Sequence, residues 1–182
     1  MKRAIFLDRD GTINHDPGYI SDPGQFVLID GAAEAIRRLN DAGYVTVVVT
    51  NQSAIARGLC TVETLHAIHN KMKILLAEKG AHIDRIYFCP HHPDGVVTEL
   101  KITCVCRKPE TGMILQAQRE LNIDLTQSWM IGDTTADMML AKRAGVRSIL
   151  VSTGHAGSDK KYDAAPDFVA KDLAGAVGVI IQ

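Results

Sequence analysis

The stretch AIFLDRDGT, residues 4–12, places two carboxylates directly behind a run of four apolar residues. An apolar run that stops at Asp8 and Asp10 is typical of a buried strand that delivers both acids to its carboxyl end. In open α/β sheets this edge is where ligands bind. Two carboxylates this close repel each other unless a cation lies between them, and Mg²⁺ prefers such oxygen ligands. Asp and Gly are also ordinary turn residues, so the stretch by itself is equally compatible with a plain turn.

Strand-like and helix-like patterns alternate along the rest of the chain. This alternation predicts right-handed βαβ units and an α/β fold, a Rossmann-like three-layer sandwich with a central parallel sheet between two helical layers. Glycines follow three of the helical patterns, as helix stops should. We expect strands at 3–7, 44–49, 85–88, 128–131, 148–151 and 167–169, and helices at 31–42, 61–79, 112–122, 134–144 and 171–181.

The composition is that of an ordinary globular protein. Of the 182 residues, 46% are hydrophobic and 23% are charged, and the mean hydropathy is +0.02. This length suits one domain, which we expect to span residues 1–182. Lys and Arg together number 20 against 21 Asp and Glu. Such a balance argues against nucleic acid or an anionic membrane as the main partner.

The sequence shows no secretion or membrane signal. Its first residues lack a cationic segment followed by an apolar run and a cleavage site, so we expect no leader peptide. No apolar stretch approaches the length that spans a bilayer, so we expect no membrane partner. We therefore expect a cytoplasmic protein, in which thiols stay reduced and cysteines more often bind metals than form bridges. We also expect a monomer.

Polar residues follow two further predicted strands. Thr50 comes directly after the run 44–49, and its hydroxyl can donate a hydrogen bond to a phosphoryl oxygen. Asp133 follows the run 128–131, and Asp137 lies one helical turn later. Each has a plain alternative, a capped turn for Thr50 and a helix cap for Asp133. Because the carboxyl ends of parallel strands meet at one edge, the repeated pattern favours a site there.

These residues together resemble the four motifs of the haloacid dehalogenase-like phosphohydrolases. The matching positions are Asp8-x-Asp10-Gly11-Thr12, Thr50, Lys108 and Gly132-Asp133-x-x-x-Asp137. Without the other three motifs, Lys108 would be interpreted as a surface lysine. The resemblance implies that Asp8 is a nucleophile that forms an aspartyl-phosphate and that Asp10 is the general acid and base. It also implies that Thr50 and Lys108 stabilise the phosphoryl oxygens.

The same resemblance implies a magnesium site. Asp8, the backbone carbonyl of Asp10 and Asp133 would bind the ion, which offsets repulsion between the phosphate and the nucleophile. Asp137 would orient the metal ligands without binding the ion directly.

Within this class the chain more closely resembles the D-glycero-D-manno-heptose 1,7-bisphosphate 7-phosphatases. The run Asn51-Gln52-Ser53-x-Ile55-Ala56-Arg57-Gly58 is the most specific match. This resemblance implies removal of the C7 phosphate from a small phosphorylated sugar, in the synthesis of ADP- or GDP-heptose for lipopolysaccharide core or surface glycan. The alternative is a histidinol-phosphate phosphatase, or another small sugar-phosphate phosphatase of the superfamily, since histidinol-phosphate phosphatases share the aspartate motif and the cysteine cluster.

The closer resemblance also implies which residues contact the substrate. They are Asp16, Pro17, Gly18, Tyr19, Asn51, Gln52, Ser53 and Arg107. For Tyr19, a plain surface aromatic is an equally good interpretation. One position departs from the pattern: many of these phosphatases carry Lys after the fourth-motif acid, and this chain has Thr134. The preferred anomer of the sugar therefore stays open.

The cysteines predict a second metal. The pairs Cys89-x-His91 and Cys104-x-Cys106 offer three thiolates and one imidazole, a normal structural zinc set. His92 is a possible substitute ligand, but the resemblance favours His91. A disulfide would suit a secreted chain better. With four protein ligands the Zn²⁺ would be structural, and it would fix the loop 89–109 that carries Arg107 and Lys108.

The spacing of the first two motifs predicts an open site. Only residues 13–49 separate Thr12 from Thr50, and much of that length is a helix and a strand, so no cap domain fits. Specificity should then come from three loops, at 13–30, 51–60 and 89–109.

Overall fold

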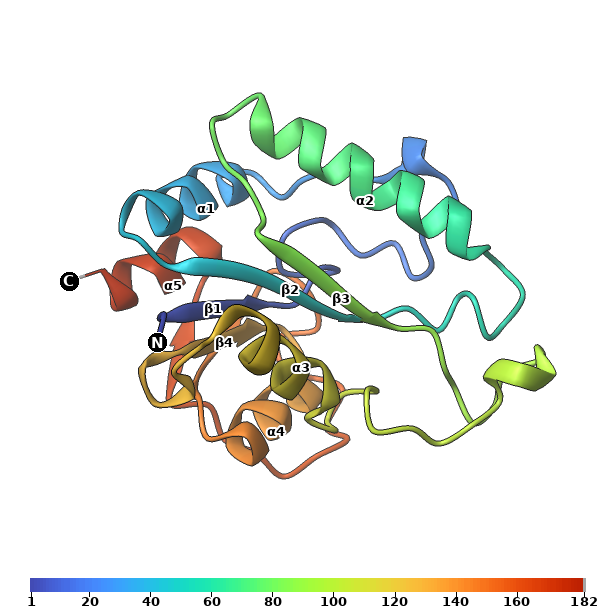
Figure 1. Cartoon of the computed structure of the whole chain (residues 1–182). Coiled ribbons are helices and arrows are strands. Elements are labelled where there is room, and N and C mark those ends of the chain that lie inside the picture. The colour runs from blue at the N-terminus through green and yellow to red at the C-terminus, as the bar shows by residue number, and fades with distance from the viewer. Residues whose placement is uncertain (182) are drawn as a thin grey trace.

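The computed structural model describes residues 1–181 and contains one six-stranded sheet in which all paired strands are parallel (Figure 1). The order across the sheet is β3-β2-β1-β4-β5-β6. The strands are β1 (Ala4–Leu7), β2 (Val45–Asn51), β3 (Arg85–Cys89), β4 (Trp129–Gly132), β5 (Arg147–Val151) and β6 (Phe168–Ala170). All six predicted strands are confirmed, with ends shifted by no more than two residues.

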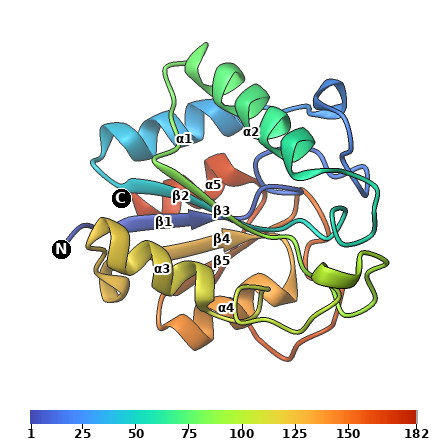
Figure 2. The same ribbon diagram turned by 45° about the vertical axis from the view of Figure 1, so that its right-hand side comes forward.

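The helices form a layer on each face of the sheet (Figure 2). One layer contains α1, α2 and α5, and the other contains α3 and α4. Their bounds are α1 (Ala32–Asp41), α2 (Val62–Ala77), α3 (Gly112–Leu121), α4 (Thr135–Ala144) and α5 (Leu173–Ile180). The predicted three-layer α/β sandwich is therefore confirmed.

Local signals explain where the helices begin and end. Thr61 starts α2 because its side chain accepts a hydrogen bond from the backbone N–H of Thr64. Gly145 ends α4 with a φ of 71°, a left-handed conformation that glycine adopts at little cost. Asn122 ends α3 in the same conformation.

Each face of the sheet has its own apolar core. Ile5 and Leu7 of β1 pack with the layer of α1, α2 and α5, whereas Ala4 and Phe6 pack with the layer of α3 and α4. The side chains of a strand alternate between the two faces, and both faces of this strand are covered. This explains why residues 4–7 are apolar without interruption and fully buried.

The sheet order places the strand ends that matter side by side. The chain leaves β1 toward β2 on one side and later returns to β4 on the other, so the switch in strand order lies between β1 and β4. The register pairs Leu7 with Val48 and with Ile131. The motif residues follow these three positions by one or two residues: Asp8, Thr50 and Asp133.

Two of the three predicted loops each contain a short helical turn. One is Pro23–Gln25, within 13–30, and the other is Thr98–Leu100, within 89–109. Within residues 1–181 no separate cap domain covers the sheet edge, as predicted. None of the helices described has the length and apolar character needed to cross a bilayer.

Candidate active site

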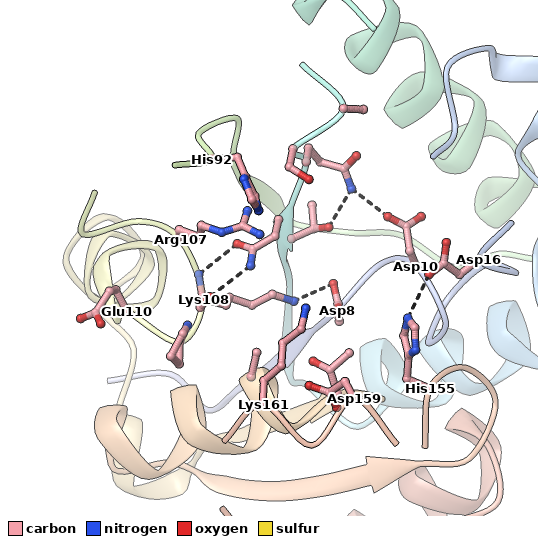
Figure 3. Close-up of a pocket in the computed structure, with 18 of the residues that line it drawn as sticks. Asp8, Asp10, Asp16, His92, Arg107, Lys108, Glu110, His155, Asp159 and Lys161 are labelled. Carbon is pink, nitrogen blue, oxygen red and sulfur yellow. Dashed lines mark hydrogen bonds and ion pairs between the residues drawn. The ribbon is translucent and has the colours of Figure 1, made fainter. Parts of the chain in front are cut away.

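A cavity of about 620 Å³ opens at the carboxyl edge of the sheet (Figure 3). Its walls come from the ends of β1, β2 and β4, from the predicted loops 13–30, 51–60 and 89–109, and from a fourth loop that follows β5. This volume suits a small phosphorylated sugar.

Asp8 and Lys108 form an ion pair at the floor of the cavity. The Lys108 Nζ lies 2.8 Å from Asp8 Oδ1 and 2.7 Å from Asp137 Oδ1. All three side chains are buried. Burial and the neighbouring acids Asp137 and Asp133 raise the pKa of Asp8, while the Lys108 charge opposes that rise. The two carboxylates raise the pKa of Lys108 despite its burial, so this lysine is charged at neutral pH.

Asp133 completes a cluster of three buried carboxylates. Oxygens of Asp8, Asp133 and Asp137 lie within 4.8 Å of one another. Burial first, and then the charge of Asp137, raises the pKa of Asp133 to about 6. Asp133 Oδ1 is buried and has no hydrogen-bond partner. One lysine balances only part of this negative charge, so the donor set and the orphaned oxygen fit a bound divalent cation.

Glycines make room for these acids. A Cβ at Gly132 would lie 2.4 Å from the Asp137 carboxyl carbon, and a Cβ at Gly154 would lie 2.1 Å from Asp133 Oδ2. Neither contact is sterically possible, because the atoms approached belong to buried and fixed side chains. The two glycines therefore allow the end of β4 and the loop after β5 to pack against the cluster.

Asp10 is held by a buried arginine. Three contacts of 2.9–3.0 Å join the Arg9 guanidinium to the Asp10 carboxylate, and Gln52 Nε2 donates to Asp10 Oδ2 at 2.8 Å. Asn14 donates to Asp10 Oδ1 at 2.9 Å. Arg9 is fully buried, so its bidentate pairing fixes the carboxylate in one orientation at the cavity wall.

His69 of α2 lies within range of the Arg9 charge. Its ring is buried edge-on to Phe88, with 6.0 Å between ring centroids, and its Nε2 has no hydrogen-bond partner. Burial, and then the positive charge of Arg9, lowers the pKa of His69 from 6.5 to about 3. The imidazole is therefore neutral in the folded protein at neutral and mildly acid pH.

We expect His69→Phe to make folding less sensitive to acid. The unfolded chain binds a proton at His69 near pH 6.5, whereas the folded chain stays neutral there down to about pH 3. Stability is therefore lost as the pH falls from 6.5 toward 3, and at pH 4 this loss is about 3 kcal/mol. Urea unfolding at pH 7 and pH 4 should show the difference. His66→Phe, at an exposed histidine of the same helix, should keep the parent's acid loss. An unchanged acid loss in His69→Phe would contradict the assignment.

The residues predicted to contact substrate divide into two groups. Asn51 and Gln52 line the cavity but are engaged within the protein. Asn51 accepts from the Lys108 N–H at 2.9 Å and donates to the Lys108 carbonyl at 3.2 Å. Gln52 bonds to Asp10 and to Thr50. These amides therefore hold other site residues in place.

The other predicted contacts face the cavity or lie beside it. Ser53 lines it from the end of β2, and Arg107 lines it while donating to the His91 carbonyl at 3.1 Å. Pro17 belongs to the same loop as the remaining contacts but does not line the cavity. The residues of that loop that do line it are Asp16, Gly18 and Tyr19.

The predicted zinc ligands come together. The three sulfur atoms of Cys89, Cys104 and Cys106 lie 3.2–3.5 Å apart, and His91 Nδ1 lies 3.4 Å from Cys106 Sγ. A disulfide requires about 2.05 Å, and all of these cysteines are free. His92 instead contacts Arg57 at 3.3 Å. A tetrahedral Zn²⁺ fits these donors, with sulfur atoms spreading to about 3.8 Å around it.

The fourth wall was not predicted from the sequence. It is the loop 152–162 after β5, which lines the cavity with His155, Asp159, Lys161 and Tyr162. The only available signal was its position, because a strand predicted at 148–151 must end at the same sheet edge as the others.

Acids from the ends of β1 and β4 meet a buried lysine at the switch point of the sheet. This fold and this arrangement of side chains define a haloacid dehalogenase-like phosphohydrolase, as the motifs predicted.

Comparisons with known proteins agree. A HAD-hydrolase-like family model matches residues 105–176. A D-glycero-β-D-manno-heptose-1,7-bisphosphate 7-phosphatase of Yersinia pestis is 49% identical over 172 residues, which cover 94% of this chain and 91% of that protein. The protein of the same name in Escherichia coli strain K12 is 46% identical and covers 94% and 90%.

A crystal structure of the D,D-heptose 1,7-bisphosphate phosphatase of B. bronchiseptica with magnesium and phosphate superimposes with a TM-score of 0.89. It is 37% identical and covers 100% of this chain and 99% of that one. The chain therefore belongs to the family of the heptose 1,7-bisphosphate 7-phosphatases.

Proposed function

We propose that this protein is a Mg²⁺-dependent phosphatase that removes the C7 phosphate of D-glycero-D-manno-heptose 1,7-bisphosphate, in the synthesis of nucleotide-activated heptose. The observation that carries the proposal is the buried cluster of Asp8, Asp133 and Asp137 around Lys108. The names of relatives that match over nearly the whole chain support the substrate. Those names specify the β anomer, which we adopt for this chain.

The reaction divides one displacement into two steps. Asp8 attacks phosphorus and forms an aspartyl-phosphate, while Lys108 and Thr50 stabilise the phosphoryl oxygens. Asp10 donates a proton to the departing sugar oxygen and then removes one from the attacking water. Mg²⁺, bound by Asp8, Asp133 and the Asp10 carbonyl, would lower the repulsion between the phosphate and the nucleophile.

The roles of two other buried residues, Asp137 and Arg9, follow from their contacts. Asp137 positions Lys108 through the 2.7 Å ion pair and is itself held by Thr134, whose Oγ1 donates to it at 2.6 Å. Arg9 fixes the orientation of Asp10. Both are positioning residues, because neither Asp137 nor Arg9 lines the cavity.

We further propose that Cys89, His91, Cys104 and Cys106 bind one structural Zn²⁺. The converging donors support this, and the absence of a free coordination position argues against catalysis there. The zinc would fix loop 89–109 within a single phosphatase domain of residues 1–182. Thiolate ligands require a reducing compartment, which supports a cytoplasmic location.

Phosphate release tests the proposed function. The protein should release inorganic phosphate from the β-heptose 1,7-bisphosphate much faster than from histidinol phosphate, with no added acceptor. Removing Mg²⁺ with a chelator should abolish the activity, and adding it back should restore it. Faster release from histidinol phosphate would assign the chain to the alternative function, and activity that survives chelation would contradict the magnesium site.

A further inference from the structure

The loop after β5 is fixed to the catalytic cluster by several hydrogen bonds. Thr153 Oγ1 donates to the Gly11 carbonyl at 2.6 Å. The His155 N–H donates to Asp133 Oδ2 at 2.6 Å, and the Gly157 N–H donates to the Asp133 carbonyl at 2.8 Å. These hydrogen bonds hold the loop backbone against the site, so the positions from which its side chains extend are fixed.

The far end of the loop is fixed as well. The backbone N–H of Lys161 donates to Thr135 Oγ1 at 3.2 Å. Thr135, the first residue of α4, in turn donates from its N–H and its hydroxyl to the two oxygens of Asp159, at 2.8 and 2.6 Å. Asp159 is thus engaged by the helix start. Figure 3 shows the Lys161 side chain extending from this point into the cavity.

The charges that line the cavity are unequally paired. Lys108 is balanced by Asp8 and Asp137. Arg107 and Lys161 line the cavity at its more exposed part, and neither forms an ion pair with a carboxylate of residues 1–181. Despite its partial burial, hydrogen bonds from Thr135 and the charge of Lys161 lower the pKa of Asp159 on the same loop, but Asp159 and Lys161 form no ion pair. The outer part of the cavity therefore carries two cations without an ion-pair partner among the described residues.

A sugar bisphosphate needs such charges. The phosphate that is transferred must reach Asp8 at the floor, so the phosphate that stays on the sugar lies further out. A phosphate monoester carries about −1.5 to −2 charges at pH 7, more than one cation balances. Arg107 on the zinc loop supplies one positive charge, and Thr134 on the wall beside α4 is uncharged. The loop after β5 contributes Lys161, a second positive charge, to the cavity.

We propose that Lys161 binds the retained phosphate of the substrate and is a specificity-determining residue of this chain. The inference rests on the proposed bisphosphatase function and deepens it, because it assigns the second phosphate to a wall of the cavity that no motif marks. The ammonium group of Lys161 and the guanidinium of Arg107 would contact that phosphate from two different loops.

Kinetics of Lys161→Met on two substrates test the proposal. We expect KM for the heptose bisphosphate to rise about tenfold, as for a charged hydrogen bond at a partly exposed site, with kcat nearly unchanged. An aryl monophosphate such as p-nitrophenyl phosphate has no second phosphate, so its kcat/KM should not change. Lys161→Arg should restore most of the lost affinity. Lys160→Met removes the same charge from the neighbouring exposed residue, which does not line the cavity, and should leave both substrates unaffected.

The outcomes test the role of Lys161 separately from the proposed bisphosphatase function. An unchanged KM for the bisphosphate in Lys161→Met would overturn the inference. An equal loss on both substrates would also overturn it, because Lys161 would then serve the transferred phosphate or the fold. If the parent protein cleaves the aryl phosphate but releases nothing from the bisphosphate, the proposed function itself fails and the inference falls with it.

Discussion

Replacing Asp8 with Asn should abolish turnover and leave the fold intact. The amide keeps the shape and can still accept the hydrogen bond that the Arg9 N–H donates to Asp8 Oδ1 at 2.7 Å. It cannot attack phosphorus, so the covalent route is lost. We expect kcat to fall by roughly 10⁴-fold or more, as when other enzymes lose their nucleophile. Phosphate release under saturating Mg²⁺ measures the loss.

The thermal stability of the same variant provides a second readout. Asp8→Asn removes one of three buried carboxylates that repel one another, so in the absence of Mg²⁺ its Tm should equal or exceed that of the parent. Asp30→Asn, which makes the same change at an exposed position outside the cavity, should keep full activity. Activity of Asp8→Asn within about tenfold of the parent would remove Asp8 from the role of nucleophile.

Loss of a zinc ligand should reduce catalysis through the position of Lys108. Cys106 precedes Arg107 and Lys108, so Cys106→Ala should release zinc and loosen both. A displacement of about 1 Å at a catalytic group can cost about 10²-fold. Lys108→Ala itself should cost about 10³-fold. Once Lys108 is absent, adding Cys106→Ala should cost little more, because residues that act as a unit are not additive.

A double-mutant cycle on kcat/KM decides whether the zinc acts through Lys108. If the zinc merely fixes a distant loop, the two losses multiply to about 10⁵-fold in the double variant. The assays must be run below the Tm of the weakest variant. Elemental analysis should find about one zinc per chain in the parent and in Cys60→Ala, whose cysteine lies outside the cluster. A zinc-free parent of full activity and stability would contradict the zinc site.

The architecture could be predicted because its determinants are local and repeated. A nearly continuous apolar run such as 45–49, in which Thr46 is the one polar residue, is typical of a strand covered on both faces. The glycine stops and alternating patterns then fix the order of strands and helices. The chemistry at the strand ends followed from the same reasoning, since parallel strands bring their carboxyl ends to one edge. The role of Lys108 followed only from the family resemblance, because this residue lies in a loop and 100 positions after Asp8, with which it forms an ion pair.

The orientation of the side chains at the site could not be predicted from the sequence. The sequence marks Gln52 as polar and near the site, but only the structure shows that its amide faces Asp10 and Thr50. The spacing of Asp137 suggested a role beside the metal site, and only the structure shows its additional ion pair with Lys108. Lys161 lies in a polar loop that resembles any solvated loop, because the hydrogen bonds that fix it run through backbone atoms.

The open mouth of the cavity bears on the fate of the aspartyl-phosphate. An enzyme that transfers the phosphoryl group to a second alcohol must keep bulk water away while the covalent species waits for its acceptor. Within residues 1–181 no lid covers Asp8. Solvent therefore reaches the acyl phosphate from the moment the sugar departs. In the proposed mechanism this access favours hydrolysis of the intermediate, with inorganic phosphate as the product.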